Sequence, residues 1–463
     1  MDKVIASPEQ AVADIPHGAT IAIAGFGVGH RFASSLLLAL RNQGTRDLCL
    51  VCNSMGGPGE VRGQILAESK QVRKLIVSFS VRPGVPTAAE EQIAAGEVEV
   101  ELVPQGTLVE RCRAGGAGIP AFYTPTSVGT LLTEGKEIRE FDGTPYVLER
   151  AIRVDYALLR AHRADRAGNL QFRGGSQNFN PSFAKAARVA IVEVDEIVDA
   201  GGIPPELVDL PGIFVSRVVR STYPIDMTNL RRPTRRAADT PRVYLGKPAL
   251  TREGIGRRAA GLIKDGSYVN LGTGIPTQVS NYLGHRDVTL HAENGILGYG
   301  EMVSGDDIDL DVYNAGGQFV ALRPGASFFD SVTSFEMARS GRIHAVILGA
   351  YEVDEHASVA NWSTRDRARG GIGGAMDLVA GGAELIIVME HCDSKNRPKL
   401  RRTCTYPLTG AGCVDWVVTD LALLHRVDGR FVLEEVAPGF TPTEVLSLTE
   451  MDLVVAPHVR SMV

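Results

Sequence analysis

The first half of the chain alternates short apolar runs with segments of helical periodicity. "TIAIAGFGVG" precedes "RFASSLLLALRN", "LCLVCN" precedes "GEVRGQILAES", and "KLIVSFS" precedes "TAAEEQIAAG". Short apolar runs that alternate with helical patterns indicate βαβ units, whose strands are mainly parallel. We therefore expect an open α/β sheet, with its ligand crevice outside the carboxyl ends of the strands.

A polar, basic and proline-containing segment interrupts this alternation near the middle of the chain. It spans residues 223–243 and has no apolar periodicity, which is typical of an interdomain linker. We expect an N-terminal domain over residues 1–222 and a C-terminal domain over residues 244–463.

The two halves resemble each other, and the similar segments occur in the same order. "HGATIAIAGFG" (17–27) is similar to "DGSYVNLGTG" (265–274), and "AARVAIVEVDE" (186–196) is similar to "GAELIIVMEH" (382–391). This pattern predicts two similar, open, mainly parallel-sheet α/β domains from a fused duplication, packed together with a site between them.

Charge and hydropathy narrow the possible partners. The net charge is −6, which gives no electrostatic footprint for nucleic acid. No apolar run approaches the ~20 residues that span a bilayer, so we expect no membrane partner. The start, "MDKVIASPEQ", has neither an apolar signal core nor a transit-peptide composition, and we expect a cytosolic protein.

The cysteines and histidines give no sign of a metal site. Cys49 and Cys52 lie in the strand-like run "LCLVC", where positions i and i+3 point to opposite faces, so they are interpreted as reduced core thiols. The ten histidines form no H-x-x-x-H or H-x-x-E-H pattern, and we expect no bound metal.

Glycine is unusually frequent, with 51 residues, and it clusters after strand-like runs. Gly25-x-Gly27 and Gly272-x-Gly274 lack the third glycine of a dinucleotide fingerprint, so a nicotinamide site is disfavoured. Glycine at a strand end instead lets backbone N–H groups approach an acyl or phosphate group. No G-x-S-x-G elbow is present, which disfavours a serine hydrolase.

One glutamate is a candidate functional residue. In "LHAENGILGYG" (290–300), Glu293 follows the strand-like "VTLHA" and precedes the turn signal Asn294-Gly295. A carboxylate there would lie at the ligand crevice of a parallel sheet. Taken alone, the pattern favours a surface glutamate before a turn.

Several long motifs together resemble family I coenzyme A transferases, in particular the single-chain succinyl-CoA:3-oxoacid CoA-transferases. "LHAENGILG" is similar to the catalytic-glutamate signature, whose usual form is Ser-Glu-Asn-Gly. The second half also matches in "VNLGTGIPTQVSNYL", "LRPGASFFDS", "GGIGGAMDLV" and "CTYPLTGAGCV". The first half matches in "VEVELVPQGTLVERCRAGGAGIPAFYTPT" and "RADRAGNLQFR". The resemblance covers nearly the whole chain.

This resemblance implies a CoA-transferase/NagB-like fold, a homodimer, and coenzyme A as substrate and covalent thioester intermediate, with no permanently bound cofactor. It implies that Glu293 is both nucleophile and CoA carrier. A carboxylate suits this chemistry because its acyl anhydride can pass the acyl group back, whereas a serine ester is too stable. Gln105, in "VPQGT", and Gly374, last in "GGIGG", match the oxyanion donors of the family.

The resemblance also predicts residues that bind substrate. The expected contacts to CoA and its acyl group are Gly272, Gly274, Asn294, Gly371 and Gly373. The candidates for the carboxylic-acid pocket are Phe26, His30, Asn53 and Arg82.

The chain departs from the family pattern at several of its motifs. Ala292 replaces the usual serine beside the glutamate, and Gly317 stands where relatives tend to carry a lysine near CoA. In the first half, "AGFGVGHRF", "NSMGG" and "SFSVRP" differ from the usual sequences. Our hypothesis is that catalysis is retained while the acid specificity is shifted.

The sequence thus predicts an enzyme that moves CoA from an acyl-CoA, with succinyl-CoA the first candidate, to a 3-oxo acid such as acetoacetate. One alternative is an acyl-CoA hydrolase on the same fold, in which water intercepts the intermediate. Another is a non-catalytic acyl-CoA or metabolite sensor, which would need no nucleophile.

Overall fold

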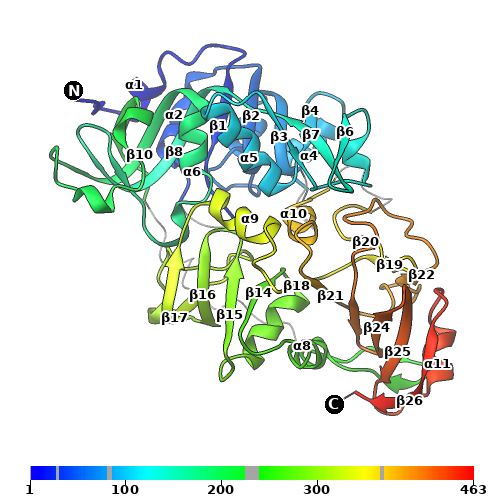
Figure 1. Ribbon diagram of the computed structural model, residues 1–463. Coiled ribbons are helices and arrows are strands. Elements are labelled where there is room, and N and C mark those ends of the chain that lie inside the picture. Colours follow the sequence, from blue (N-terminus) through cyan, green and yellow to red (C-terminus); the bar gives the residue numbers. More distant parts are fainter. Residues whose placement is uncertain (1, 28–30, 81–85, 225–238, 365–369, 463) are drawn as a thin grey trace.

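The computed structural model describes residues 2–27, 31–80, 86–224, 239–364 and 370–462. Two lobes, one from each half of the chain, lie one above the other in Figure 1. Each lobe is built around its own sheet. The expected linker falls largely outside the described residues, so the domain limits remain a prediction.

The described residues of the first half form an eight-stranded sheet in which every neighbouring pair along the main path is parallel. In sheet order its strands are β11 (Arg217–Arg220), β10 (Ala187–Val198), β8 (Val154–Asp165), β1 (Thr20–Ile23), β2 (Leu48–Ser54), β3 (Val72–Phe79) and β4 (Glu99–Leu102), with β9 (Leu170–Gln171) antiparallel to β8.

The second half forms a ten-stranded sheet within its described residues. Its order is β17 (Val320–Phe328), β16 (Ile296–Met302), β15 (Val288–Ala292), β14 (Ser267–Leu271), β18 (Ala345–Leu348), β21 (Glu384–Met389), β23 (Trp416–Thr419), β24 (Ala422–Val427), β25 (Arg430–Val436) and β26 (Val454–Ser461). The strands from β15 to β23 are parallel, while β16, β17, β24 and β25 add antiparallel pairs at the two sides. The expected α/β fold is confirmed, with a more mixed second sheet.

The similar segments of the two halves occupy equivalent places in the two sheets. β1 and β14 each have one parallel neighbour that follows directly along the chain, β2 and β15 respectively. On the other side, one strand separates β1 from β10 and one separates β14 from β21. The carboxyl ends of β2 and β15 are therefore equivalent positions in the two lobes.

Shorter elements complete the lobes. The helices are α1 (Pro8–Val12), α2 (Ser34–Gln43), α3 (Gln64–Glu68), α4 (Ala88–Ala94), α5 (Gln105–Gly116), α6 (Asn180–Ala186), α8 (Arg252–Ala260), α9 (Ser331–Arg339), α10 (Ala375–Val379) and α11 (Pro442–Ser447). The small sheets are β5 (Ala121–Thr124), β6 (Ile138–Phe141) and β7 (Thr144–Arg150); β19 (Glu352–Asp354), β20 (Val359–Ala360) and β22 (Leu400–Arg401); and β12 (Val243–Tyr244) with β13 (Lys247–Pro248).

Strand β2 contributes to the apolar core on both faces of the first sheet. β2 is buried almost throughout, and its side chains point to opposite faces of the sheet. Cys49 belongs to the apolar cluster on one face and Cys52 to the cluster on the other. Both thiols are free and buried, as the spacing predicts.

Helix α9 joins the lobes by entering the core of the other half. Val332 and Phe335, on α9, belong to the same buried apolar cluster as residues of β1, β8 and α5. Figure 1 shows α9 and α10 between the second sheet and helices α5 and α6 of the first lobe. Because this contact is apolar and buried, the lobes share a continuous core at their junction.

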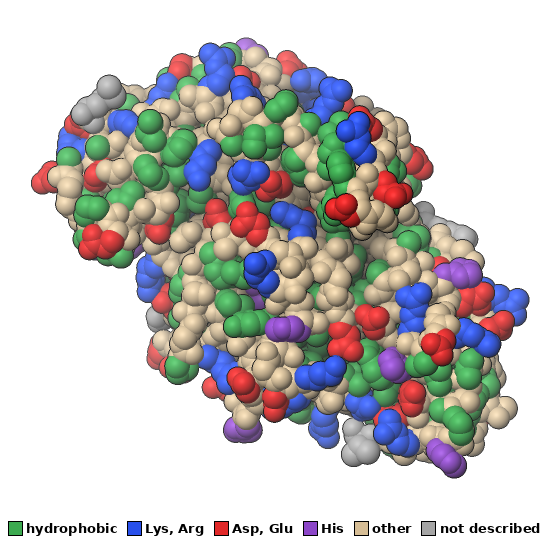
Figure 2. Space-filling model, in the orientation of Figure 1, with side chains coloured by type: hydrophobic (Ala, Val, Ile, Leu, Met, Phe, Trp, Pro, Cys, Tyr) green, Lys and Arg blue, Asp and Glu red, His purple; other side chains and the backbone are tan. Residues whose placement is uncertain are grey.

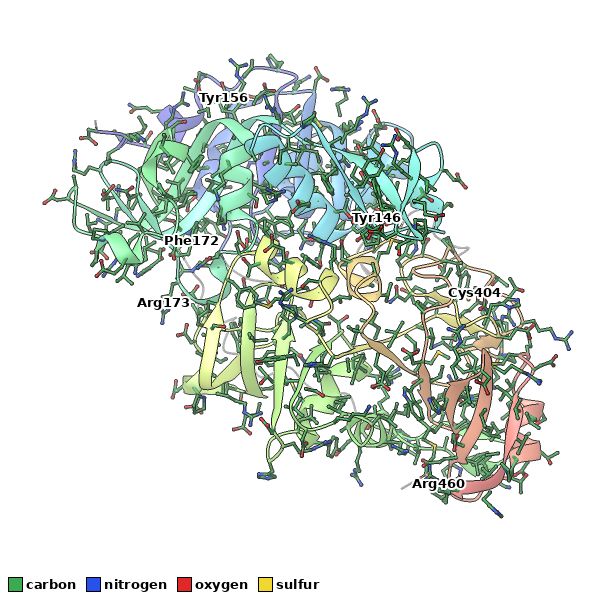
Figure 3. All side chains as sticks on the ribbon, in the orientation of Figure 1. Tyr146, Tyr156, Phe172, Arg173, Cys404 and Arg460 are labelled. Carbon is green, nitrogen blue, oxygen red and sulfur yellow. The ribbon has the colours of Figure 1, made fainter. Side chains whose placement is uncertain are left out.

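Buried ion pairs also cross the junction. Asp311, fully buried in the second lobe, accepts from Arg31 Nε at 2.6 Å and from Arg173 Nη1 at 2.9 Å. Figure 3 shows Arg173 where the lobes meet. Removing one partner of such a pair would leave a buried charge uncompensated, so these contacts fix the lobes relative to each other.

The surface is electrostatically mixed. Figure 2 shows Lys and Arg side chains interspersed with Asp and Glu over the visible face. Among the described helices, none is both long enough and apolar enough to cross a lipid bilayer.

Candidate active site

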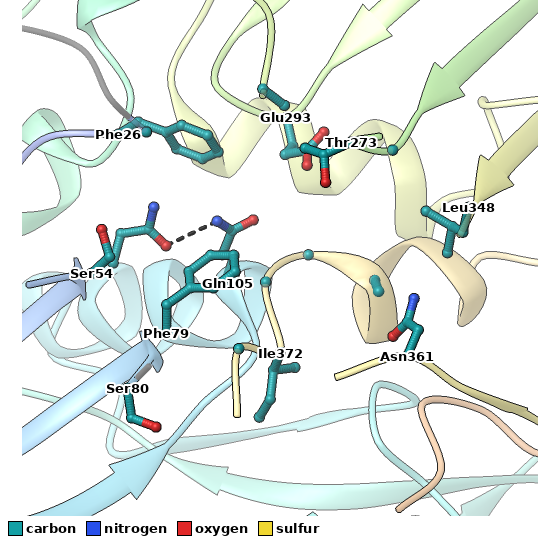
Figure 4. Close-up of a pocket in the computed structure, with 18 of the residues that line it drawn as sticks. Phe26, Ser54, Phe79, Ser80, Gln105, Thr273, Glu293, Leu348, Asn361 and Ile372 are labelled. Carbon is teal, nitrogen blue, oxygen red and sulfur yellow. Dashed lines mark hydrogen bonds between the residues drawn. The ribbon is translucent and has the colours of Figure 1, made fainter. Parts of the chain in front are cut away.

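A cavity of about 490 Å³ opens between the two lobes, and both halves of the chain line it. Glu293 and Gln105 project into it from opposite walls (Figure 4). The other described residues that line it are mainly small or uncharged. Those that the sequence singled out as site residues are Phe26, Asn53, Gly272, Gly371, Gly373 and Gly374. The expected site between the domains therefore has a physical counterpart.

Glu293 begins the turn between β15 and β16. Gly295 has φ +114°, and a Cβ there would lie 2.1 Å from the Phe329 carbonyl oxygen, so only glycine fits this turn. Asn294 is buried and donates from Nδ2 to the Tyr313 carbonyl at 2.7 Å. Asn294 is not part of the cavity lining, and its contact braces the turn that carries Glu293.

The Glu293 carboxyl is half-buried at the cavity wall. Burial raises its pKa above the ordinary value, and a hydrogen bond from Asn270 Nδ2 to Oε2, at 3.1 Å, partly opposes that rise. Poor solvation of a carboxylate increases its basicity and reduces the water that must be displaced when it attacks.

A neutral histidine lies behind this carboxyl. His291 is fully buried between Asn270, at 3.0 Å from Nδ1, and Ser334 Oγ, at 3.0 Å from Nε2. Burial lowers the pKa of His291 to about 4, so the ring is uncharged near neutral pH. The wall behind Glu293 therefore provides hydrogen bonds without a positive charge from this ring.

Gln105 is the first residue of α5, and its side chain is held by Asn53. Gln105 Nε2 donates to Asn53 Oδ1 at 2.9 Å, and both side chains are buried. This bond uses one of the two Nε2 hydrogens, so the second remains for a ligand in the cavity. Asn53 lies near the carboxyl end of β2, the position equivalent to the end of β15 that precedes Glu293.

The glycine-rich loop of the second lobe, "GGIGG" (370–374), is hydrogen-bonded to the first lobe. Ile372 N donates to the Ser78 carbonyl at 2.8 Å, and Gln105 N donates to the Gly373 carbonyl at 2.9 Å. A Cβ at Gly371 would lie 2.5 Å from Phe79 Cδ1, so a side chain there would clash. The loop sequence thus reflects close packing as well as any approach to a ligand.

Gly374 closes this loop directly beside Gln105. A Cβ at Gly374 would lie only 3.0 Å from Gln105 Oε1 and 2.9 Å from Phe335 Cε1. The two predicted oxyanion donors therefore come together in the cavity, although 269 positions separate them along the chain.

Of the two glycines after β14, Gly272 lines the main cavity and Gly274 lines a smaller one of about 310 Å³. The two cavities share Thr273, which lies beside Glu293 in Figure 4. Gly316 and Gln318, the neighbours of Gly317, also line the smaller cavity. The departure at Gly317 thus lies next to the site.

The structure describes two of the four residues predicted for the carboxylic-acid pocket. Phe26 and Asn53 line the cavity. His30 and Arg82 lie outside the described residues, so their predicted roles are not tested.

Sequence reasoning missed a buried arginine in the cavity wall. Arg62, on the loop before α3, is 7% exposed, and its guanidinium carbon lies 4.4 Å from the Phe32 ring centre. Its Nε lies 3.2 Å from Glu60 Oε2, and Nη1 donates to the Gly27 carbonyl. Arg62 and Glu293 are the charged side chains of the described cavity lining. In the sequence Arg62 follows a Gly-Pro-Gly stretch with no strand signal, so it resembles an ordinary loop residue.

Comparisons with known proteins agree with the family resemblance. The Coenzyme A transferase family matches residues 5–221 and 252–447. The chain is 41% identical, over 99% of its length and 91% of the relative, to succinyl-CoA:3-ketoacid coenzyme A transferase 2, mitochondrial, of Homo sapiens. It is 40% identical to the 2A enzyme, mitochondrial, of Mus musculus, over 98% of this chain and 90% of the relative.

A solved structure shares the fold. It is an acyl-CoA transferase of E. coli O157:H7, determined as a thioester complex with CoA. The match covers 100% of this chain and 95% of that one, with a TM-score of 0.81 and 20% sequence identity.

The expected cytosolic location is contradicted by these relatives. The human and mouse proteins that match nearly the whole chain are named as mitochondrial, and these names overturn the expectation of a cytosolic protein. The prediction failed because it relied on the composition of the N-terminal residues alone.

Proposed function

The chain belongs to the coenzyme A transferase family, and from this premise we propose that it transfers CoA through a covalent thioester on Glu293. The proposed donor is succinyl-CoA and the proposed acceptor is a 3-oxo acid, the pair that the names of the relatives suggest. The homodimer implied by the resemblance is part of the proposal and is tested by light scattering in solution.

The proposed reaction passes through two covalent intermediates on Glu293, an acyl anhydride and a CoA thioester. A Glu293 oxygen attacks the thioester carbonyl, and the C–S bond breaks to give an acyl-glutamyl anhydride and CoA thiolate. The thiolate then attacks the glutamyl carbonyl, releasing the first acid as its carboxylate and leaving glutamyl-CoA. The acceptor carboxylate repeats these steps in reverse and departs as the new acyl-CoA, which restores Glu293.

Each attack creates an oxyanion, which Gln105 Nε2 and the Gly374 N–H would stabilise. Donors fixed in advance in a partly dehydrated site are worth roughly 2.7–4 kcal/mol each. Gly374 lies close to the Gln105 amide, since a Cβ at Gly374 would lie 3.0 Å from Oε1, and this proximity supports a shared oxyanion site. Burial of Glu293 supports its role as a poorly solvated nucleophile.

The observation that carries the proposal is the meeting of Glu293, Gln105 and Gly374 in one interlobe cavity. A surface glutamate before a turn would not face two candidate oxyanion donors from separate loops. The Glu293 carboxyl instead lines the cavity together with both of them.

The test uses the purified protein and succinyl-CoA without an acceptor. Borohydride reduction should convert a glutamyl-CoA thioester to an alcohol, and mass spectrometry should place the change on Glu293. Glu293→Gln should lose both the labelled peptide and CoA transfer. Labelling of another residue, or full turnover by the variant, would refute the mechanism.

An acceptor panel separates transferase from hydrolase. CoA transfer that requires an added carboxylic acid supports the proposal. Multiple turnovers of CoA release in water alone would instead identify a hydrolase. Acceptance of acetoacetate above all other acids would refute the shifted acid specificity while leaving the transferase chemistry intact.

A further inference from the structure

Asp377 is a buried carboxylate that the proposed reaction does not use. It lies on α10, three residues after Gly374, and its side chain is 0% exposed. A carboxyl so completely withdrawn from water requires several compensating contacts.

Three of these contacts come from the other lobe, two of them at the start of α5 and one from the loop after β5, and a fourth comes from α9. Asp377 Oδ2 accepts from Gly106 N at 2.8 Å, and Oδ1 accepts from Thr126 Oγ1 at 3.2 Å and Thr107 Oγ1 at 3.4 Å. Arg339 Nη1 lies 3.6 Å from Oδ1. A helix N-terminus presents unsatisfied N–H groups and a partial positive charge, so it suits a carboxylate.

The packing at this point leaves no space for a side chain at Gly106. A Cβ at Gly106 would lie 2.5 Å from Asp377 Oδ1, so the carboxylate rests directly against the helix backbone. Glycine at the second position of α5 is thus explained by the approach of Asp377.

A second hydrogen bond acts beside the first. Gln105 N donates to the Gly373 carbonyl at 2.9 Å, immediately before Gly106 N meets Asp377. Two consecutive amides of α5 are therefore bound by residues on either side of Gly374. These two hydrogen bonds hold the backbone of Gln105 close to that of Gly374, the two proposed oxyanion donors.

We infer that Asp377 is a positioning residue that sets the geometry of the oxyanion site by holding the start of α5 against the start of α10. This inference rests on the proposed function. Misplacing a catalytic group by about 1 Å can lower a rate by about 10²-fold.

A purely structural contact between lobes is the competing explanation, and Asp311 provides a matched control. Asp311 is also fully buried and also bridges the lobes, through Arg31 and Arg173. Its carboxylate contacts neither α5 nor the glycine loop in the described structure. Loss of lobe packing alone should affect both variants in the same way.

The first experiment compares Asp377→Ala with Asp311→Ala. We expect Asp377→Ala to lower kcat by about 10²-fold, with the KM for acyl-CoA changed less than about threefold. Asp311→Ala should lower the thermal midpoint while kcat falls less than about threefold. Equal losses of kcat in the two variants would overturn the inference.

The second experiment is a double-mutant cycle with Gln105→Ala. If Asp377 acts through the oxyanion donors, Asp377→Ala should cost at least threefold less in the Gln105→Ala background than in the wild type. An identical factor in both backgrounds would refute the positioning role. Gly374 retains its amide in this cycle, so partial rather than complete loss of the effect is expected.

Two further variants keep the test decisive if Asp377→Ala does not fold. Asp377→Asn retains the size of the side chain, and Thr126→Val removes one donor to the carboxylate while leaving its charge. Both should lower kcat, by smaller factors, and both should show the same dependence on Gln105.

Borohydride labelling of wild-type Glu293 is run in parallel. Absence of the label refutes the proposed function. Normal labelling without coupling between Asp377 and Gln105 refutes only the positioning role.

Discussion

Asn270 donates a hydrogen bond from Nδ2 to Oε2 of Glu293 over 3.1 Å. This bond favours the ionised carboxylate and so lowers the pKa of Glu293, against the stronger opposite effect of burial. Asn270→Ala should therefore raise the pKa of Glu293 further. Because the attacking group is the carboxylate, the acid limb of kcat/KM should move to higher pH by roughly one unit.

The measurement is the pH profile of kcat/KM for succinyl-CoA. Asn281→Ala, in an exposed position of the same lobe, should leave the acid limb in place. An acid limb that stays unmoved in Asn270→Ala, or moves to lower pH, would contradict the assignment of that limb to Glu293.

Gln105 and Asn53 should contribute unequally to the rate. Gln105→Ala removes a proposed oxyanion donor, so kcat should fall by about 10²–10³-fold. Asn53→Ala removes one hydrogen bond that orients Gln105, so kcat should fall only about fivefold to tenfold. Steady-state kinetics, with the exposed Asn42→Ala as control, tests this order. A larger loss for Asn53→Ala would place Asn53, rather than Gln105, at the reacting atoms.

Local sequence patterns predicted the strand and turn around Glu293 well. The run 288–292 forms β15, and the Asn-Gly signal forms the turn that follows. Both depend on periodicity and on backbone conformations that favour glycine, and these are properties of neighbouring residues. The antiparallel sides of the second sheet were not predicted, because strand direction depends on the pairing partner.

The contacts between the two lobes could not be predicted from local sequence patterns. Asp377 meets Gly106 across 271 positions of the chain, and neither residue stands out from its neighbours in the sequence. Arg62 similarly gives no local signal that its guanidinium is buried in a cavity. Such pairs depend on how the lobes pack, so the sequence predicted the strand and turn around Glu293 but not the residues that orient its surroundings.

Arg62 should determine which acyl groups the cavity accepts. A buried guanidinium stays charged and favours a second carboxylate, such as that of a succinyl group, over a neutral chain end. Arg62→Leu should therefore lower kcat/KM for succinyl-CoA relative to butyryl-CoA by about tenfold or more. Arg62→Lys should retain part of the preference.

The quantity to measure is the ratio of the two kcat/KM values rather than either value alone. Arg73→Leu, at an exposed position of β3, should leave the ratio unchanged. Equal losses for both donors in Arg62→Leu would indicate a structural role for Arg62 and would contradict a role in specificity.

Asp377 should also leave a signature in the pH dependence of stability. Burial raises its pKa from 3.8 to about 6, although Arg339 and the donors around the carboxylate oppose the rise. The folded state then holds a proton that the unfolded state releases between these values. The stability linked to this group is complete below pH 3.8 and is lost as the pH rises through 6, by about 3 kcal/mol at most.

Asp377→Asn cannot titrate, so its stability should lack this loss. Any deficit of the variant relative to the wild type should shrink as the pH rises from 4.5 to 7.5. Thermal midpoints of both proteins over this range test the prediction. The titratable side chains that face the carboxylate are Arg339, at 3.6 Å, and Glu110 behind it, at 3.9 Å from Arg339. A deficit that grows with pH would mean that the carboxylate is stabilised in its charged form.

His391 should destabilise the protein in acid. It is fully buried, with Nδ1 2.9 Å from Thr419 Oγ1 and Nε2 3.0 Å from Thr449 Oγ1, and burial lowers its pKa to about 3. The unfolded state therefore binds a proton below pH 6.5 that the folded state excludes. Stability present above pH 6.5 should be lost as the pH falls towards 3, by about 1 kcal/mol between pH 7 and 5.5.

His391→Gln can keep polar contacts to both threonines without titrating, so its thermal midpoint should fall less over this interval. The exposed His458→Gln should follow the wild type, and equal acid sensitivity of all three proteins would show that another group controls the loss.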